Sequence, residues 1–115
     1  MKDDRLYLIH ILECIRRIEE YVADDQDRFF QSTLVQDGVL RNLQTLAESA
    51  QRLSETIKKN YPEVDWRGLS GLRNILVHDY LGVNLREVWQ LLATRLPPLK
   101  DTIQRILGDL EGTHS

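Results

Sequence analysis

The sequence has little of what cross-links or interrupts a chain: one cysteine, three prolines and six glycines in 115 residues. Because Cys14 stands alone, an internal disulfide and a multi-cysteine metal site are both excluded. The few prolines and glycines mostly sit where a helix could begin or end, so the stretches between them can stay helical. There is no alternating strand pattern, no internal repeat and no low-complexity segment.

Long apolar runs are also missing. No segment approaches the length that spans a bilayer, and Met1-Lys2-Asp3-Asp4 lacks the basic flank and apolar core of a signal peptide. Since a single cysteine suits a reducing compartment, these absences predict a soluble, cytoplasmic protein. The length and the 42% apolar content predict one domain over residues 1–115, with a core that needs no cross-links.

Positive charge is in deficit over the whole chain, which carries a net charge of −3 and has a pI of about 5.6. This balance does not indicate a broad nucleic-acid surface. The charge is uneven, however: residues 1–30 carry eight acidic side chains against five basic ones, whereas residues 66–105 carry six basic against three acidic. The second half could therefore have a local positive field that contacts a few phosphates.

What the sequence does contain is apolar residues at helical spacing. The first stripe predicts a helix of about twenty residues, and it consists of Leu6, Ile9, Leu12, Ile15, Ile18 and Val22. Similar stripes predict helices over residues 33–59, 66–80, 85–96 and 99–110, with Pro97-Pro98 as a kink or break before the last. The expected N-caps are Asp3 or Asp4, Ser32, Asp65 and Asn84. The expected fold is all-α, an up-and-down bundle of four to five helices.

Three histidines, His10, His78 and His114, are the side chains that titrate near neutral pH when unperturbed. His114 lies in the tail, and His10 at the edge of an apolar stripe is typical of a partly buried structural residue. The lone Cys14 is typical of a small core residue. There is no pair of cysteines, and no two histidines lie one turn apart, so the sequence predicts no metal site and no cofactor.

The segment from Arg73 to Tyr80 combines four polar side chains on one predicted helix. At about 100° per residue, Asn74 and His78 share a face one turn apart, and Arg73 and Tyr80 lie close together two turns apart. The four side chains would form a polar seam on the side of the helix away from its leucines. An ordinary polar helix face fits the same pattern, and the residues alone leave both interpretations open.

The spacing of Arg73, four residues, His78, one residue and Tyr80 resembles the signature of HepT-like toxins in the HEPN superfamily. The likeness covers nearly the whole chain in the family's order, through residues 7–13, 36–43, 47–50, 61–66, 83–89 and 96–99. Gly38 and Ser49 are two small departures, because alanine is common at both positions.

The resemblance implies a HEPN-like homodimer that cleaves RNA, such as tRNA or mRNA, without a metal ion, in a composite cleft between two motif helices. It implies His78 as general acid or base and Arg73 as the group that holds the scissile phosphate. Asn74 would orient His78 or contact the phosphate. Two copies would supply both an acid and a base from a chain with one candidate histidine.

The resemblance further implies a toxin–antitoxin pair, in which a nucleotidyltransferase antitoxin of the MntA type transfers AMP to Tyr80. An anionic group at that position would compete with RNA for Arg73. Packing at the helix end, with the hydroxyl hydrogen-bonded, is the structural alternative for Tyr80. The functional alternative for the chain is a non-catalytic HEPN-like subunit that binds the substrate or partner of a nucleotidyltransferase.

Two further interpretations concern residues outside this motif. Glu48 and Arg52, four apart on a predicted helix, are expected to form an ion pair. Trp66 and Trp89 are expected to make core or dimer contacts rather than to stack on RNA bases.

Overall fold

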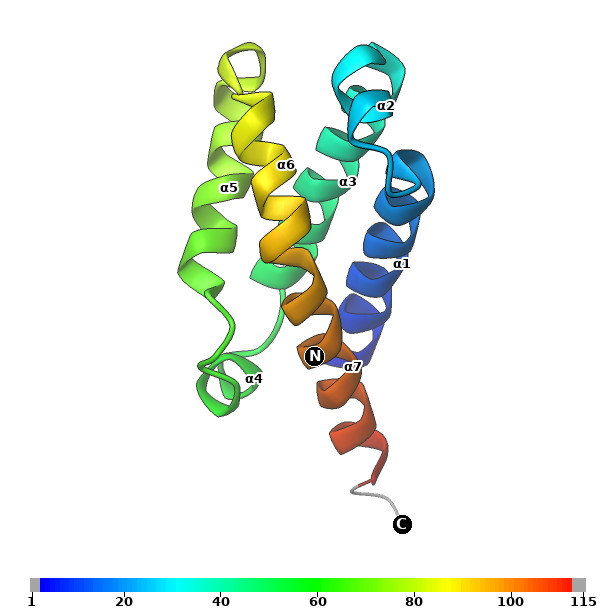
Figure 1. Ribbon diagram of the computed structural model, residues 1–115. Coiled ribbons are helices and arrows are strands. Elements are labelled where there is room, and N and C mark those ends of the chain that lie inside the picture. The colour runs from blue at the N-terminus through cyan, green and yellow to red at the C-terminus, as the bar shows by residue number, and fades with distance from the viewer. Residues whose placement is uncertain (1–2, 113–115) are drawn as a thin grey trace.

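The computed structural model describes residues 3–112, which fold into helices joined by short turns (Figure 1). In chain order the elements are α1 (Asp4–Val22), α2 (Gln26–Gln31), α3 (Thr33–Gln51), α4 (Glu55–Asn60), α5 (Trp66–His78), the 3₁₀ turn η1 (Tyr80–Gly82), α6 (Leu85–Thr94) and α7 (Leu96–Gly112). Residues 3–112 contain no strand, so the predicted all-α class is confirmed. His114 lies outside the described residues.

The helices begin where the sequence places their N-caps. The side chains of Asp3, Ser32, Asp65 and Asn84 each accept a hydrogen bond from a backbone N–H in the first turn. Such a bond satisfies one of the donors that the first turn of a helix leaves unpaired. The expected break near Pro97-Pro98 is also confirmed. The helix ends at Thr94, and both prolines lie in the first turn of α7, where a missing N–H costs little.

The prediction of one helix over residues 33–59 is wrong, because α3 ends at Gln51 and a new helix, α4, begins at Glu55. Ser54 caps α4 through its hydroxyl, which accepts a hydrogen bond from the Ile57 N–H at 3.3 Å. The backbone N–H and the hydroxyl of Ser54 donate to the two carboxylate oxygens of Asp4, at 2.8 and 2.7 Å. The short helices α2 and α4 therefore raise the number of helices above the four or five expected.

The long helices α1 and α3 form the centre of the bundle. α5 packs on α3, and α7 packs on α1 and α6. In Figure 1 successive long helices run in alternating directions, which is the expected up-and-down order. The fully buried core comes mainly from α1, α3 and α7, through Leu8, Ile11, Ile15, Ile18, Val39, Leu43, Leu46, Ile103 and Ile106.

Trp89 lies in a small aromatic cluster with Phe29, their ring centroids 5.5 Å apart. Trp66 and Trp89 are both partly buried against the core, which confirms their interpretation as core contacts. None of the helices in residues 3–112 has the length and apolar content that a membrane span requires.

α5 lies on the outside of the bundle, with α3 as its principal neighbour (Figure 1). Leu76 is its buried residue, and Leu69 and Leu72 pack partly buried against the core. Its opposite face, which includes Ile75 and His78, is exposed to solvent. The helix that carries the candidate motif is thus anchored on one side and uncovered on the other.

Candidate functional site

Arg73 projects from α5 toward α3, and its guanidinium lies between two polar side chains. Its Nη1 donates a hydrogen bond to the Asn74 Oδ1 at 3.2 Å, and its Nε lies 3.9 Å from the Glu48 Oε2. The Nε is buried and has no hydrogen-bond partner within residues 3–112, although 31% of the surface of the Arg73 side chain is exposed to solvent. Part of the Arg73 side chain therefore stays accessible to an anion.

His78 is the last residue of α5 and is exposed. Within residues 3–112 its ring makes no hydrogen bond to another side chain. The helix ends directly behind it, where the Asp79 backbone N–H donates to the Ile75 carbonyl at 2.8 Å. The imidazole is therefore open to solvent and can approach a substrate from outside the bundle. Asn74, expected to share its face and orient it, contacts Arg73 instead.

Tyr80 lies beyond the helix, in η1, and this corrects the prediction that it sits two turns from Arg73 on one continuous helix. Its hydroxyl donates a hydrogen bond to the Asp37 Oδ1 at 2.9 Å, so it faces α3. Partial burial, and then this bond to Asp37, raise the pKa of the Tyr80 phenol above its ordinary value. The hydroxyl thus ties the turn after α5 to the start of α3.

Asp37 and Glu48 are the two site residues that sequence reasoning did not find. The expected ion pair between Glu48 and Arg52 is wrong: Arg52 is the exposed C-cap of α3, and Glu48 faces Arg73 instead. A signal does exist in retrospect. Asp37 and Glu48 are eleven residues apart, close to three full turns, and so lie on one face of α3. That face meets α5.

His10 is exposed rather than partly buried, but it does have a structural contact. Its Nδ1 lies 2.8 Å from the hydroxyl oxygen of the buried Ser49, which links α1 to α3. Cys14 is fully buried in the core, as expected, and burial raises the pKa of its thiol. Neither residue lies on α5.

The family model for HepT-like ribonucleases matches residues 11–106, a span that contains all of α3, α5 and η1. The chain belongs to the ribonuclease HepT-like family. The resemblance seen in the sequence is therefore confirmed, and the all-α fold is the one that this resemblance implied.

Three relatives show how far the similarity of this HepT-like chain extends. It is 36% identical over 111 residues to a Methanocaldococcus jannaschii protein named as a gamma-glutamylcyclotransferase and, provisionally, an RNase. It is 33% identical over 112 residues to a second protein of that organism with a provisional RNase name. It is 30% identical over 101 residues to a Thermococcus cleftensis protein named probable ribonuclease HepT.

The alignments cover 96%, 96% and 87% of the HepT-like chain, respectively, and 50%, 93% and 92% of the three relatives. The chain thus spans half the length of the first relative and nearly all of the other two. No solved structure matches it significantly.

Exposed apolar side chains accompany the motif of the HepT-like chain. Ile75 is 52% exposed, Val77 is 39% exposed, and Leu81 in η1 is 99% exposed. Gly71, one turn before Ile75, has open space around the position that a Cβ would occupy. Ile75 and Val77 are about 200° apart on the helix, so they flank its exposed face from two sides.

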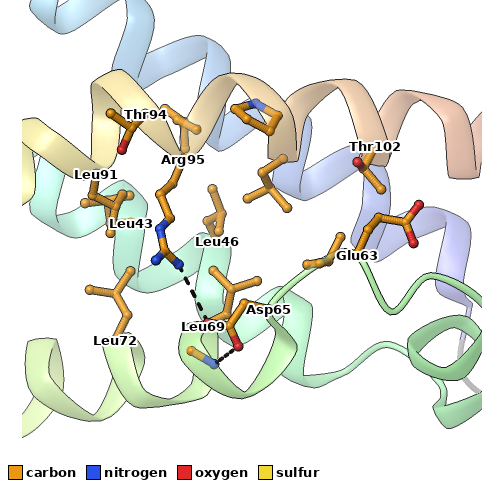
Figure 2. Close-up of a pocket in the computed structure, with 15 residues that line it drawn as sticks. Leu43, Leu46, Glu63, Asp65, Leu69, Leu72, Leu91, Thr94, Arg95 and Thr102 are labelled. Carbon is orange, nitrogen blue, oxygen red and sulfur yellow. Dashed lines mark hydrogen bonds and ion pairs between the residues drawn. The ribbon is translucent and has the colours of Figure 1, made fainter.

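One cavity of the HepT-like chain lies away from the motif. It has a volume of about 440 Å³ and is lined by residues of α3, α5, α6 and α7 with the 63–65 segment; Arg73, His78 and Tyr80 are not among them. Figure 2 shows Arg95 reaching across this cavity to Asp65, where their charged atoms are 3.7 Å apart. The motif therefore lies outside this cavity, with His78 exposed and Arg73 and Tyr80 partly buried.

Proposed function

We propose that the chain is a ribonuclease that cleaves RNA without a metal ion, at a site completed by a second copy. One observation carries the proposal: the His78 ring is exposed and unpartnered within residues 3–112, on the same uncovered helix as the half-buried cation Arg73. The RNase names of the relatives support the reaction class.

In the proposed reaction the neutral imidazole of one His78 takes the proton from a ribose 2′-hydroxyl. The 2′ oxygen then attacks the adjacent phosphorus and forms a 2′,3′-cyclic phosphate. The 5′ oxygen leaves and takes a proton from the protonated His78 of the second copy. Positioned proton transfer of this kind accelerates a reaction by about 10²–10⁴-fold.

Arg73 supplies the charge for the same step. Its guanidinium is held between Glu48 and Asn74, and it would contact the non-bridging phosphate oxygens on which negative charge accumulates. A donor that is already oriented stabilises this charge without a reorganisation cost at the moment of reaction. Asn74 supports the phosphate site through Arg73.

The exposed face of α5 is the surface that we assign to the second copy. In a two-fold dimer the same patch faces itself, so Ile75 and Gly71 of one copy would meet those of the other. Apolar contact there would exclude water from the space between the two histidines. It would also bring two Arg73 cations together, which compensates for the net charge of −3 on each chain.

We assign Tyr80 as the acceptor for a nucleotidyl group that an antitoxin nucleotidyltransferase would add. The group would act through α3, since the hydroxyl bonds to Asp37 and not to Arg73. Its phosphate would replace the hydrogen-bond donor and repel the Asp37 carboxylate. The turn that follows His78 would then move, and the imidazole with it.

The test is RNA cleavage by the purified chain in excess EDTA. We expect His78→Ala and Arg73→Ala each to abolish cleavage while the far-UV circular dichroism spectrum stays unchanged. Arg5→Ala and Lys59→Ala are the controls, because both residues are exposed on helices other than α3 and α5. Full cleavage by the His78→Ala variant would remove the catalytic assignment. A folded dimer of the natural sequence that leaves RNA intact would favour the binding-subunit alternative.

A further inference from the structure

The buried Nε–H of Arg73 is the most unusual polar group at this site. It is the buried side-chain nitrogen that lacks a hydrogen-bond partner in residues 3–112. Buried donors are nearly always paired, so an unpaired one calls for an explanation. The carboxylate oxygen that faces it is the Glu48 Oε2. It lies 3.9 Å from the Nε, about 1 Å farther than in an ordinary N–H···O hydrogen bond.

Glu48 itself is well placed to accept that hydrogen bond. It lies on α3, the helix against which α5 packs, and its side chain is 41% exposed. Within residues 3–112 its carboxylate forms an ion pair with Arg73. The neighbouring Ser49 is fixed by His10 across 2.8 Å, which holds this part of α3 in place.

We propose that Glu48 is the positioning residue for Arg73, an inference that rests on the proposed RNA cleavage. Its carboxylate closes on the Nε–H when a phosphate binds and fixes the plane of the guanidinium. Asn74 already accepts one Nη1 hydrogen. Both Nη2 hydrogens and the second Nη1 hydrogen are then left for the phosphate oxygens, in the fork geometry that suits a phosphate.

The charge of Glu48 has a second consequence for the site. Arg73 is partly removed from water, and a neighbouring carboxylate stabilises a cation in that position. The pair also restricts the flexible arginine side chain before RNA arrives, so less freedom is lost on binding. Glu48 does not contact the reacting atoms in this arrangement, and its effect reaches them through Arg73.

The experiment compares Glu48→Ala and Glu48→Gln with the natural chain. The control is Glu55→Gln on α4, because Glu55 also holds a long ion pair, 3.8 Å from Lys58. The first measurement is hydrogen exchange at the Arg73 Nε by NMR with saturating inorganic phosphate present, with the resonance assigned from its loss in Arg73→Lys. The second is kcat and KM for cleavage of a fluorogenic RNA oligonucleotide in EDTA.

We expect Glu48→Ala to speed exchange at the Arg73 Nε and to lower kcat by about 10- to 100-fold, the loss that matches one charge-assisted hydrogen bond. The KM should change less, and Glu48→Gln should fall between Ala and the natural residue. Glu55→Gln should leave both measurements unchanged.

Three results would overturn the inference: unchanged exchange in Glu48→Ala, unchanged kcat in both variants, or a higher kcat that marks Glu48 as a competitor of the phosphate. Failure of the proposed function looks different, because the natural chain would then cleave no RNA. The exchange measurement still decides in that case whether Glu48 holds Arg73.

Discussion

The Tyr80 hydroxyl donates a hydrogen bond to the Asp37 carboxylate across 2.9 Å, and this single bond joins the turn after the motif helix to α3. Tyr80 follows His78 by two residues, so the bond also limits how far the imidazole can move. The bond and the contact between Arg73 and Glu48 both reach α3, the first from η1 and the second from α5. Together they set the position of the motif from the α3 side.

The first prediction concerns the strength of this link. Tyr80→Phe removes the donor, and the free energy of unfolding should fall by about 1 kcal/mol, since the bond is partly exposed to solvent. Urea denaturation measures the change. Tyr7→Phe is the control, because Tyr7 packs against the core and its hydroxyl makes no hydrogen bond within residues 3–112. An equal loss in both variants would show that the bond to Asp37 contributes nothing specific.

The second prediction concerns alkaline pH. The pKa of Tyr80 is raised in the folded chain, first by burial and then by Asp37. The stabilisation is therefore fully present below the pKa of an unfolded tyrosine, about 10, and is lost as the pH rises through the folded value. The natural chain should lose stability above pH 10 more steeply than Tyr80→Phe. Tyr61, whose pKa is also raised by its bond to Asp109, titrates in both chains and cancels. If the free energies of unfolding of the two chains fall in parallel above pH 10, the raised pKa of Tyr80 is contradicted.

The third prediction tests the composite site. If each active unit needs two intact copies, His78→Ala chains mixed with the natural chain should inhibit it. At equal amounts about a quarter of freely exchanging dimers hold two natural copies, so cleavage should fall to about a quarter of that of the natural chain alone at the same total protein concentration. Arg5→Ala chains, whose changed residue is exposed on α1, serve as the mixing control. A fall to one half would mean that each copy cleaves independently.

The fourth prediction concerns the surface that joins the copies. Ile75→Asp places a charge on the uncovered face of α5 and should convert the dimer to a monomer that has lost cleavage. Ile75 is half exposed in the single chain, so the monomer's stability should change by about 0.5 kcal/mol or less. Analytical ultracentrifugation gives the mass. Leu34→Asp, on an exposed residue of α3, should leave the dimer intact. If the natural chain is itself a monomer, the composite site is wrong.

Local sequence pattern was sufficient for much of this molecule. The apolar spacing in residues 6–22 and the caps at Ser32, Asp65 and Asn84 place the long helices close to where they are observed. Helical spacing and capping depend on neighbours within about one turn, so they can be derived from consecutive residues. The same holds for the motif, since Arg73, Asn74 and His78 do lie on one helix.

The contacts that orient the motif depend on the tertiary structure. Asp4 binds Ser54 and splits a predicted helix, and Asp37 holds Tyr80 from a position 43 residues earlier. By charge Glu48 could pair with Arg52 or with Arg73. Its spacing of four residues from Arg52 on one helix favoured that pair in the sequence. Packing of α5 on α3 brings it to Arg73 instead. A charged side chain pairs with the opposite charge that the fold brings within a few ångströms, whatever their distance in sequence. The sequence by itself therefore determined most of the long helices and the residues of the candidate motif, while only the fold decided the short helices and which way the motif residues face.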